Sequence, residues 1–241
     1  MSQYKAVFFD LDGTLVPMDT EEFLQRYFAV LTKFFAKKGF DNAEDLVKLV
    51  FVGTKEMCAQ HAGVSNMDAF WDFFCEKAQV ERSAFLPLMD EFYTTDFNEI
   101  GKSITPDPHM LSAIELLKEK KYPLYLTTMP LFPLVAVKSR LSWIQLSPDM
   151  FERITTYENS DSIQPMAEYY QANVDFAGVP AQQVLMVGNH TREDLAACKI
   201  GCDAFIVTDH LLNPDNIDLS TVKHGSMEEF KRFVSELPVC E

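Results

Sequence analysis

The chain has 241 residues, of which 47% are hydrophobic, enough for a buried core in one domain with a large insertion or in two small domains. Its 36 acidic and 21 basic residues give a net charge of -15, which argues against nucleic acid or an anionic membrane as the main partner. No signal peptide and no apolar run of roughly eighteen residues is visible, so we expect no membrane partner and a cytoplasmic location.

The first predicted element is a short apolar strand that ends at Phe9 and runs directly into the string Asp10-Leu11-Asp12-Gly13-Thr14-Leu15. Two carboxylates two residues apart at a strand end face one open edge of a sheet. The glycine lets the backbone turn sharply, so the N–H groups that follow can bind an anion. The alternative is an Asx-type turn at a strand end, which requires no ligand.

The string DLDGTL resembles the first motif of the haloacid dehalogenase (HAD) superfamily, most of whose members are magnesium-dependent phosphatases. The resemblance implies that Asp10 is the nucleophile and Asp12 the general acid and base. It implies that both hold Mg²⁺ or Mn²⁺, Asp12 through its backbone carbonyl, and that Gly13 and Thr14 help to bind phosphate. Dehalogenases of this superfamily usually lack the second aspartate, so Asp12 favours phosphoryl chemistry.

Helical patterns dominate the segment that follows. A helix capped by Asp19 carries aromatic and aliphatic residues at helical spacing and closes at Gly39. Three further helices are predicted over 43–51, 67–78 and 82–93. With no alternating strand pattern between them, we expect residues 17–102 to form an all-helical cap domain, which leaves 1–16 and 103–241 as the core domain.

From residue 105 onward helices and strands alternate. Helices are predicted over 108–120, 131–141, 166–177 and 193–200, and strands over 122–127, 154–157, 184–187 and 204–207. Such alternation predicts an α/β fold, with a Rossmann-like parallel sheet covered by helices on both faces. Ligands of such sheets bind at the carboxyl ends of the strands. A core of this kind with a helical cap inserted after the first motif is the arrangement of capped HAD enzymes.

The second strand of the core domain ends at two threonines. HAD proteins carry a Ser or Thr at this place, which hydrogen-bonds the transferring phosphoryl group and is usually followed by Asn. The resemblance therefore implies Thr128 as the phosphate-binding residue, although Met129 follows it, and Thr127 is the second candidate. The alternative is that Thr128 only caps the helix after it.

Beyond the strand at 154–157, family members usually have a lysine followed by proline. Here Gln164 precedes Pro165, and a glutamine can donate hydrogen bonds to phosphate but carries no charge. Loss of one preorganised donor from such a site costs about 3 kcal/mol of transition-state stabilisation. Four basic residues could supply the missing charge, namely Lys55, Lys138, Arg140 and Arg192.

The strand at 184–187 leads into the string Gly188-Asn189-His190-Thr191-Arg192-Glu193-Asp194, where many HAD enzymes have Gly-Asp and a second Asp that complete the magnesium shell. The resemblance implies Asn189 and Asp194 as metal ligands, with Glu193 as the alternative to Asp194. His190 would suit a transition ion if it touched the metal, or it stays in the loop without touching it. Thr191 and Asp194 also have the spacing of a capping box, which requires no metal.

The resemblance to the HAD superfamily implies a magnesium-dependent phosphomonoesterase that acts on a small phosphorylated metabolite through an aspartyl-phosphate, with the cap excluding large substrates. The departures at Met129, Gln164, Asn189 and His190 support a second hypothesis. In it, the chain is a HAD-fold protein of weak or absent activity that binds a ligand or a protein. The sequence indicates neither the substrate nor the oligomeric state.

Overall fold

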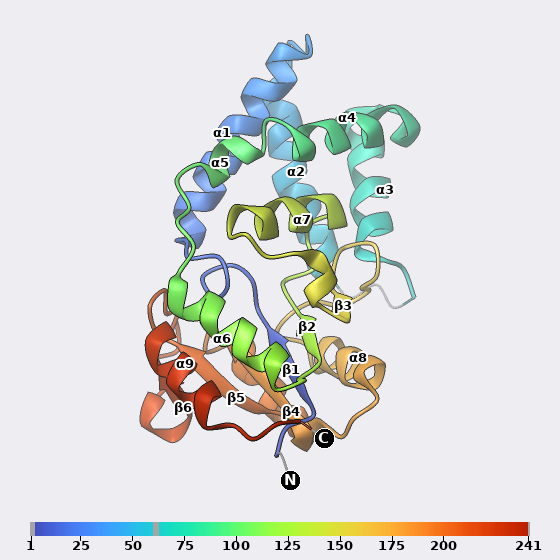
Figure 1. Ribbon diagram of the computed structural model, residues 1–241. Coiled ribbons are helices and arrows are strands. Elements are labelled where there is room, and N and C mark those ends of the chain that lie inside the picture. The colour runs from blue at the N-terminus through green and yellow to red at the C-terminus, as the bar shows by residue number, and fades with distance from the viewer. Residues whose placement is uncertain (1–2, 60–62, 241) are drawn as a thin grey trace.

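The computed structural model describes residues 3–59 and 63–240. Its centre is a parallel sheet with the strand order β3-β2-β1-β4-β5-β6 (Figure 1). The strands are β1 Ala6–Phe9, β2 Leu124–Leu126, β3 Arg153–Ile154, β4 Val184–Gly188, β5 Asp203–Val207 and β6 Lys223–Gly225. Phe9 of β1 lies in register with Leu126 of β2 and Val187 of β4. The residues that follow these three strands therefore emerge together at one edge of the sheet.

The α-helices are α1 Thr20–Lys37, α2 Ala43–Cys58, α3 Asn66–Ala78, α4 Arg82–Thr94, α5 Asn98–Gly101, α6 Pro108–Glu119, α7 Leu134–Trp143, α8 Ala167–Ala177 and α9 Met227–Glu236. Short 3-10 helices are η1 Pro148–Met150, η2 Ala181–Gln183, η3 Asp194–Ile200 and η4 Leu219–Thr221. Within the described ranges, none of the helices combines the length and the apolar composition that crossing a bilayer requires.

Helices cover both faces of the sheet, because successive side chains of a strand point to opposite faces. Val7 and Phe9 of β1 enter the apolar cluster that contains buried side chains of α6 and α9. Phe8 enters a second cluster with side chains of α8 and η3. The predicted α/β architecture is therefore confirmed, with the strands β1, β2 and β4 buried on both sides as parallel strands usually are.

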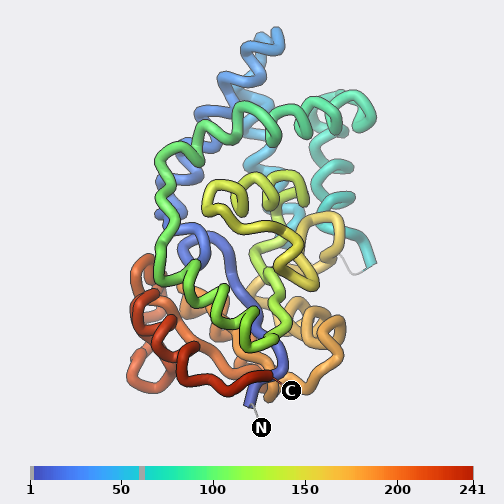
Figure 2. Tube along the Cα trace, viewed as in Figure 1, coloured from blue at the N-terminus to red at the C-terminus, as the bar shows by residue number. Residues whose placement is uncertain are grey.

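Helices α1 to α5 lie together beyond the edge of the sheet at which the site residues emerge (Figures 1 and 2). The first of them begins where predicted, since the Asp19 carboxylate accepts the Glu22 N–H at 2.8 Å. Its buried aromatic face joins the same apolar cluster as Phe9 of the sheet. Helix α7, which follows β2, packs against α4 and α5. The helical insert thus shares one hydrophobic core with a helix from the other part of the chain.

The start of α3 is tied to the loops at the end of the sheet. The Asn66 side chain is completely buried, and its amide lies 3.1 Å from the Pro130 carbonyl and 3.3 Å from the Ser162 carbonyl. The next backbone N–H, from Met67, donates to the Tyr157 carbonyl at 2.8 Å. These bonds join α3 to the loops after β2 and β3, so this helix is held against the edge of the sheet at which the candidate residues emerge.

Several predicted elements have other bounds in the structure. The helix expected over 43–51 is α2, which continues to Cys58, and the strand expected over 122–127 is limited to Leu124–Leu126. The helix expected from residue 131 begins at Leu134, after Pro133 in the N-cap position. The strand expected over 154–157 ends at Ile154, because the Thr156 N–H donates to the Asn159 side chain in a turn. The helix expected over 193–200 is the 3-10 helix η3, which ends at Gly201 with a positive φ of 104°. Strand β6 and helix α9 lie beyond the last predicted element.

Candidate active site

Asp10 is the first residue after β1, and its side chain is almost buried. Its N–H donates to the Val187 carbonyl at 2.9 Å, which holds it beside β4. The Thr14 hydroxyl lies 3.4 Å from Asp10 Oδ2 and 3.2 Å from Asn189 Oδ1. One hydroxyl hydrogen can serve only one acceptor at a time. Thr14 therefore links the carboxylate after β1 to the amide after β4.

The turn after Asp10 depends on Gly13. Its φ is 81°, and a Cβ there would lie 2.2 Å from Asn189 Nδ2. The Gly13 N–H donates to the Val16 carbonyl at 2.8 Å, and the Thr14 N–H donates to the Leu11 carbonyl at 3.3 Å. Both N–H groups are thus used inside the turn, and the contact of Gly13 and Thr14 with phosphate stays a prediction. What Gly13 contributes is the close approach of Asn189 to the turn.

Asp194 lies against the end of β4, with a side chain that is almost completely buried. The Asp194 side chain can occupy this space because residue 188 is glycine, since a Cβ on Gly188 would lie 2.0 Å from Asp194 Cγ. The His190 N–H donates to Asp194 Oδ2 at 2.8 Å. The predicted capping box is wrong, because the Thr191 hydroxyl lies 2.9 Å from Asn213 Oδ1 instead. Within the described ranges Asp194 Oδ1 is buried without a hydrogen-bond partner.

The carboxyl groups at this edge have raised pKa values. Burial raises the pKa of Asp10 well above its ordinary value, and the charges of Asp194 and Asp12 act in the same direction. Burial also raises the pKa of Asp194 to about 7, with a contribution from Glu193. A cation held between these groups would favour their charged forms and lower both pKa values.

The donor atoms suit a hard cation. Asp10 and Asp194 supply carboxylate oxygens, one of them without a partner in the described structure, and Asn189 Oδ1 supplies an amide oxygen. No three His, Cys, Asp or Glu side chains among residues 3–59 and 63–240 form a metal-ligand cluster by themselves. Carbonyl oxygens such as that of Asp12, together with water, would have to complete the shell, as Mg²⁺ commonly requires. The residues therefore fit Mg²⁺.

Asp12 forms an ion pair that the spacing of the sequence does not indicate. Arg140 Nη1, from α7, donates to Asp12 Oδ2. The Arg140 side chain is completely buried, and its guanidinium carbon lies 4.5 Å from the centroid of the Phe132 ring. Burial raises the pKa of Asp12, and the Arg140 charge opposes this rise. Asp12 Oδ1 is buried and has no hydrogen-bond partner among the residues described.

The two threonines after β2 have different surroundings. The Thr127 hydroxyl lies 3.3 Å from the Phe9 carbonyl, so it is used inside the sheet, and the alternative assignment of Thr127 to phosphate binding stays a prediction. The Thr128 carbonyl accepts the Tyr169 hydroxyl at 2.8 Å, which fixes the backbone at the sheet edge. Helix α7 has Pro133 as its N-cap, so Thr128 does not cap it. Thr128 stays the candidate for phosphate binding.

Gln164 is buried, and its Nε2 donates to the Thr127 carbonyl at 3.0 Å. The amide therefore stands next to the end of β2, the strand that precedes Thr128. A lysine of the family would bring a charge to this place, whereas the amide brings only hydrogen-bond donors. The predicted contact of Gln164 with phosphate stays a prediction, since the observed donor is bonded to the backbone.

Of the four basic residues considered as replacements for that lysine, the structure brings one to the carboxylates. Lys55 is exposed, with its ammonium 5.2 Å from the centroid of the Phe51 ring. Lys138 is exposed on α7. Arg192 forms an exposed ion pair with a surface aspartate at 2.5 Å. Arg140 alone among these four is buried and paired with a site carboxylate.

His190 and Glu193 lie in the loop between Asn189 and η3. The His190 ring accepts backbone N–H groups of Arg192 and Glu193 through Nδ1, both at 3.2 Å. Its Nε2 lies 3.8 Å from Glu193 Oε1, so the imidazole folds back on its own loop. The Glu193 carbonyl accepts the Tyr170 hydroxyl at 2.7 Å. Both residues stay predictions as metal ligands, with Asp194 in the more buried position.

The family model of haloacid dehalogenase-like hydrolases matches residues 4–200. The chain belongs to this family. A HAD phosphatase from Thermococcus onnurineus is similar in structure, with a TM-score of 0.60 at 18% identity over 95% of this chain and 97% of that one. The L-2-haloacid dehalogenase from Xanthobacter autotrophicus has a TM-score of 0.54 at 14% identity over 97% of this chain and 99% of that one. A search of curated proteins gives no match.

These similarities establish the HAD fold, and they include both phosphatases and dehalogenases. The sequence does not distinguish Arg140 from the other three basic residues by spacing, although it contains one signal. The buried positions of α7 are Ala136, Val137, Arg140 and Leu141, so the arginine lies on the apolar face of its helix. A charged residue on such a face is rarely buried without a partner, which indicates a buried acid nearby.

Proposed function

We propose that this HAD-like hydrolase is a magnesium-dependent phosphomonoesterase that acts on a small phosphorylated metabolite. The observation that carries the proposal is the position of Asp10. It is a nearly buried carboxylate at the end of β1, with Asp194 and Asn189 on one side and Asp12 two residues away. This arrangement offers a nucleophile, oxygen ligands for a cation and a second carboxylate for proton transfer.

In the proposed reaction, a carboxylate oxygen of Asp10 attacks phosphorus while the bond to the leaving oxygen breaks and Asp12 donates a proton to that oxygen. Asp12 then takes a proton from water, whose oxygen attacks phosphorus and releases Asp10 and inorganic phosphate. The hydroxyl of Thr14 orients Asp10 Oδ2 for the first step. Mg²⁺ bound by Asp10, Asp194 and the Asp12 carbonyl would offset repulsion between the anionic nucleophile and the substrate.

Two features support this reaction over dehalogenation and limit the substrate. Asp12 is the residue that dehalogenases of the superfamily usually lack, and proton transfer to a leaving oxygen requires such a group. The bonds from Asn66 hold the helical insert against the site edge. A closed cap of this kind favours small substrates over polymers. We propose the insert, residues 17–102, as the cap domain.

The test is phosphate release from a panel of small phosphomonoesters with Mg²⁺, with Mn²⁺ and with EDTA. We expect metal-dependent turnover that falls at least about a thousandfold in Asp10→Asn, since the nucleophile is lost. Asp72→Asn, an exposed carboxylate of α3, is the matched control and should keep wild-type activity. Equal, slow release by wild type and Asp10→Asn under every metal condition would overturn the proposal and favour a binding protein without catalysis.

A further inference from the structure

Arg140 has hydrogen-bond donors that the fold does not use. Its Nη1 pairs with Asp12, while Nε and Nη2 are buried and have no acceptor among the residues described. These two nitrogens form the side edge of the guanidinium, from which two parallel N–H bonds can bind one carboxylate or phosphate. Buried charged donors without acceptors are costly and rare in folded proteins. The free edge therefore indicates a bound oxyanion.

The surroundings of Arg140 preorganise this edge. The guanidinium packs over Phe132, and the side chain is completely buried, so its plane is fixed before any ligand binds. Arginine stacked in this way loses little freedom when it forms a bidentate pair. The ion pair with Asp12 uses only one of the nitrogens. Arg140 thus differs from an exposed arginine, whose N–H groups donate to water.

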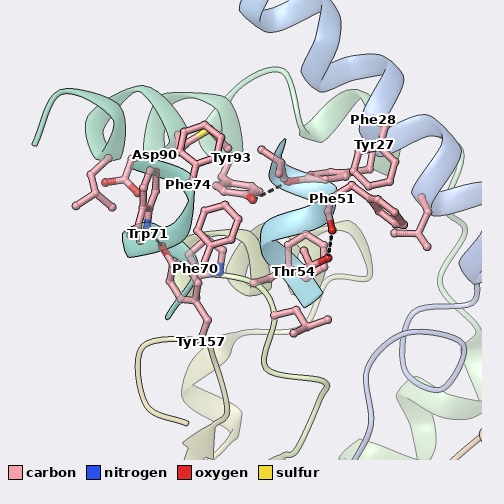
Figure 3. Close-up of a pocket in the computed structure, with 17 residues that line it drawn as sticks. Tyr27, Phe28, Phe51, Thr54, Phe70, Trp71, Phe74, Asp90, Tyr93 and Tyr157 are labelled. Atoms are coloured by element: carbon pink, nitrogen blue, oxygen red, sulfur yellow. Dashed lines mark hydrogen bonds between the residues drawn. The ribbon is translucent and has the colours of Figure 1, made fainter. Parts of the chain in front are cut away.

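Arg140 stands between the acid Asp12 and the cap. Its charge lowers the pKa of Tyr27, which burial raises to about 12, and it acts on the pKa of Tyr93 in the same direction. The hydroxyls of these tyrosines lie 3.0 Å apart. Both tyrosines and Phe132 line an aromatic cavity of about 180 Å³ between the cap helices and the loop after β2 (Figure 3). Because the guanidinium packs over Phe132, one of the lining residues, it lies beside this cavity on the cap side of the site.

The cap side is where the leaving group of a substrate belongs. In the proposed function the phosphoryl group is bound at Asp10 and Thr128, and Asp12 protonates the leaving oxygen. Arg140 is bonded to Asp12, and its guanidinium packs over Phe132, which lines the cavity together with Tyr27 and Tyr93. An oxyanion at the free edge would then belong to the leaving group and not to the phosphoryl group that is transferred.

We propose that Arg140 binds a second oxyanion, a carboxylate or a phosphate on the leaving group, through parallel bonds from Nε and Nη2. The substrate class is then a small phosphomonoester that carries an additional acidic group, such as a phosphorylated hydroxy acid or a bisphosphate. Only the place of the oxyanion in the leaving group rests on the proposed function. Binding of an oxyanion at Arg140 is expected whether or not the protein turns substrate over.

The kinetic test compares substrates that differ in one group. 3-Phosphoglycerate and glycerol 3-phosphate differ in a carboxylate, and the bisphosphate and monophosphate of 1,3-propanediol differ in a phosphate. We expect kcat/KM of wild type to be at least about tenfold higher for the acidic member of one pair, as charged hydrogen bonds allow. The pair that shows the preference identifies the oxyanion. Arg140→Lys should lose this preference, while Lys138→Gln, exposed on the same helix, should keep it.

A binding test separates this inference from the proposed function. Calorimetry on Asp10→Asn should show tighter binding of the acidic member of the same pair, again by about tenfold or more. If wild type releases no phosphate but Asp10→Asn still prefers the acidic member, the phosphatase proposal fails and the oxyanion site stands. If neither wild type nor Asp10→Asn prefers an acidic member, the inference is overturned. The preference of wild type and Asp10→Asn for the acidic member tests the oxyanion site even if Arg140→Lys does not fold.

Discussion

Asp194→Asn should stabilise the metal-free protein, and increasingly so as the pH rises. Asp194 is almost completely buried, and its Oδ2 accepts one backbone N–H while Oδ1 has no partner among the described residues. Burial raises its pKa from 3.8 to about 7. Asparagine keeps an oxygen for the His190 N–H and has nearly the same shape as aspartate, but it cannot ionise. The substitution therefore measures the effect of the charge alone.

The direction of this pH dependence is set by the proton that Asp194 binds in the folded protein. Between pH 4 and pH 7 the folded protein keeps a proton on Asp194 that the unfolded chain has released. The contribution of Asp194 to stability is thus complete below the unfolded pKa and is lost as the pH rises through the folded one. A shift of about three pKa units corresponds to about 4 kcal/mol at full loss. Most of it, about 3 kcal/mol, falls between pH 5 and pH 8.

Urea unfolding in EDTA at pH 5, 6, 7 and 8 measures this effect. The stability of Asp194→Asn relative to wild type should grow by about 3 kcal/mol over this range, while exposed Asp72→Asn follows wild type. Mg²⁺ at pH 8 should stabilise wild type and leave Asp194→Asn nearly unchanged, because ligand binding to the folded state adds stability. A difference in unfolding free energy between variant and wild type that stays constant from pH 5 to pH 8 would contradict a raised pKa of Asp194 in the folded protein.

Three further substitutions test other contacts. Asn66→Ala should lower the free energy of unfolding by about 1 to 3 kcal/mol in the same urea assay, because two backbone carbonyls lose their side-chain donor. Asn42→Ala, at an exposed position, is the control and should change the free energy of unfolding little. Gly188→Ala places a Cβ 2.0 Å from the Asp194 carboxyl and should abolish stabilisation by Mg²⁺; a retained Mg²⁺ effect contradicts this. Gln164→Lys should raise kcat for phosphate release, because it adds a charge at the end of β2 that Arg140, paired with Asp12, does not supply there; an unchanged kcat contradicts this.

The sequence predicted those features that depend on neighbouring residues. The alternation of helices and strands gave the parallel sheet, and the polar residues after β1, β2 and β4 meet at one edge because the strand ends are in register. The cap of α1 by Asp19 follows from local capping chemistry and is confirmed. Local periodicity is sufficient for such features, since each is decided by residues a few positions apart.

Features that depend on residues distant in the chain could not be predicted. Arg140 and Asp12 are 128 positions apart, and only the packing of α7 brings them together. Which of Thr127 and Thr128 faces the sheet depends on the register of β2 with β1. Side-chain direction at a strand end is set by such tertiary contacts, not by residue type. One local feature was also missed, since the Gly13 N–H of the turn donates to the Val16 carbonyl three residues on.

The place of the positive charge has a chemical consequence for the proposed reaction. A lysine at position 164 would act on the nucleophile and the phosphoryl group, whereas Arg140 acts on the acid and base Asp12. Asp12 must hold a proton when the leaving oxygen departs and must be ionised when water attacks. Burial favours the protonated form and Arg140 the ionised form, with burial the larger effect. An oxyanion bound to the free edge of Arg140 would partly neutralise the guanidinium charge, so Arg140 would lower the pKa of Asp12 less. The protonated, proton-donating form of Asp12 is then favoured while substrate is bound.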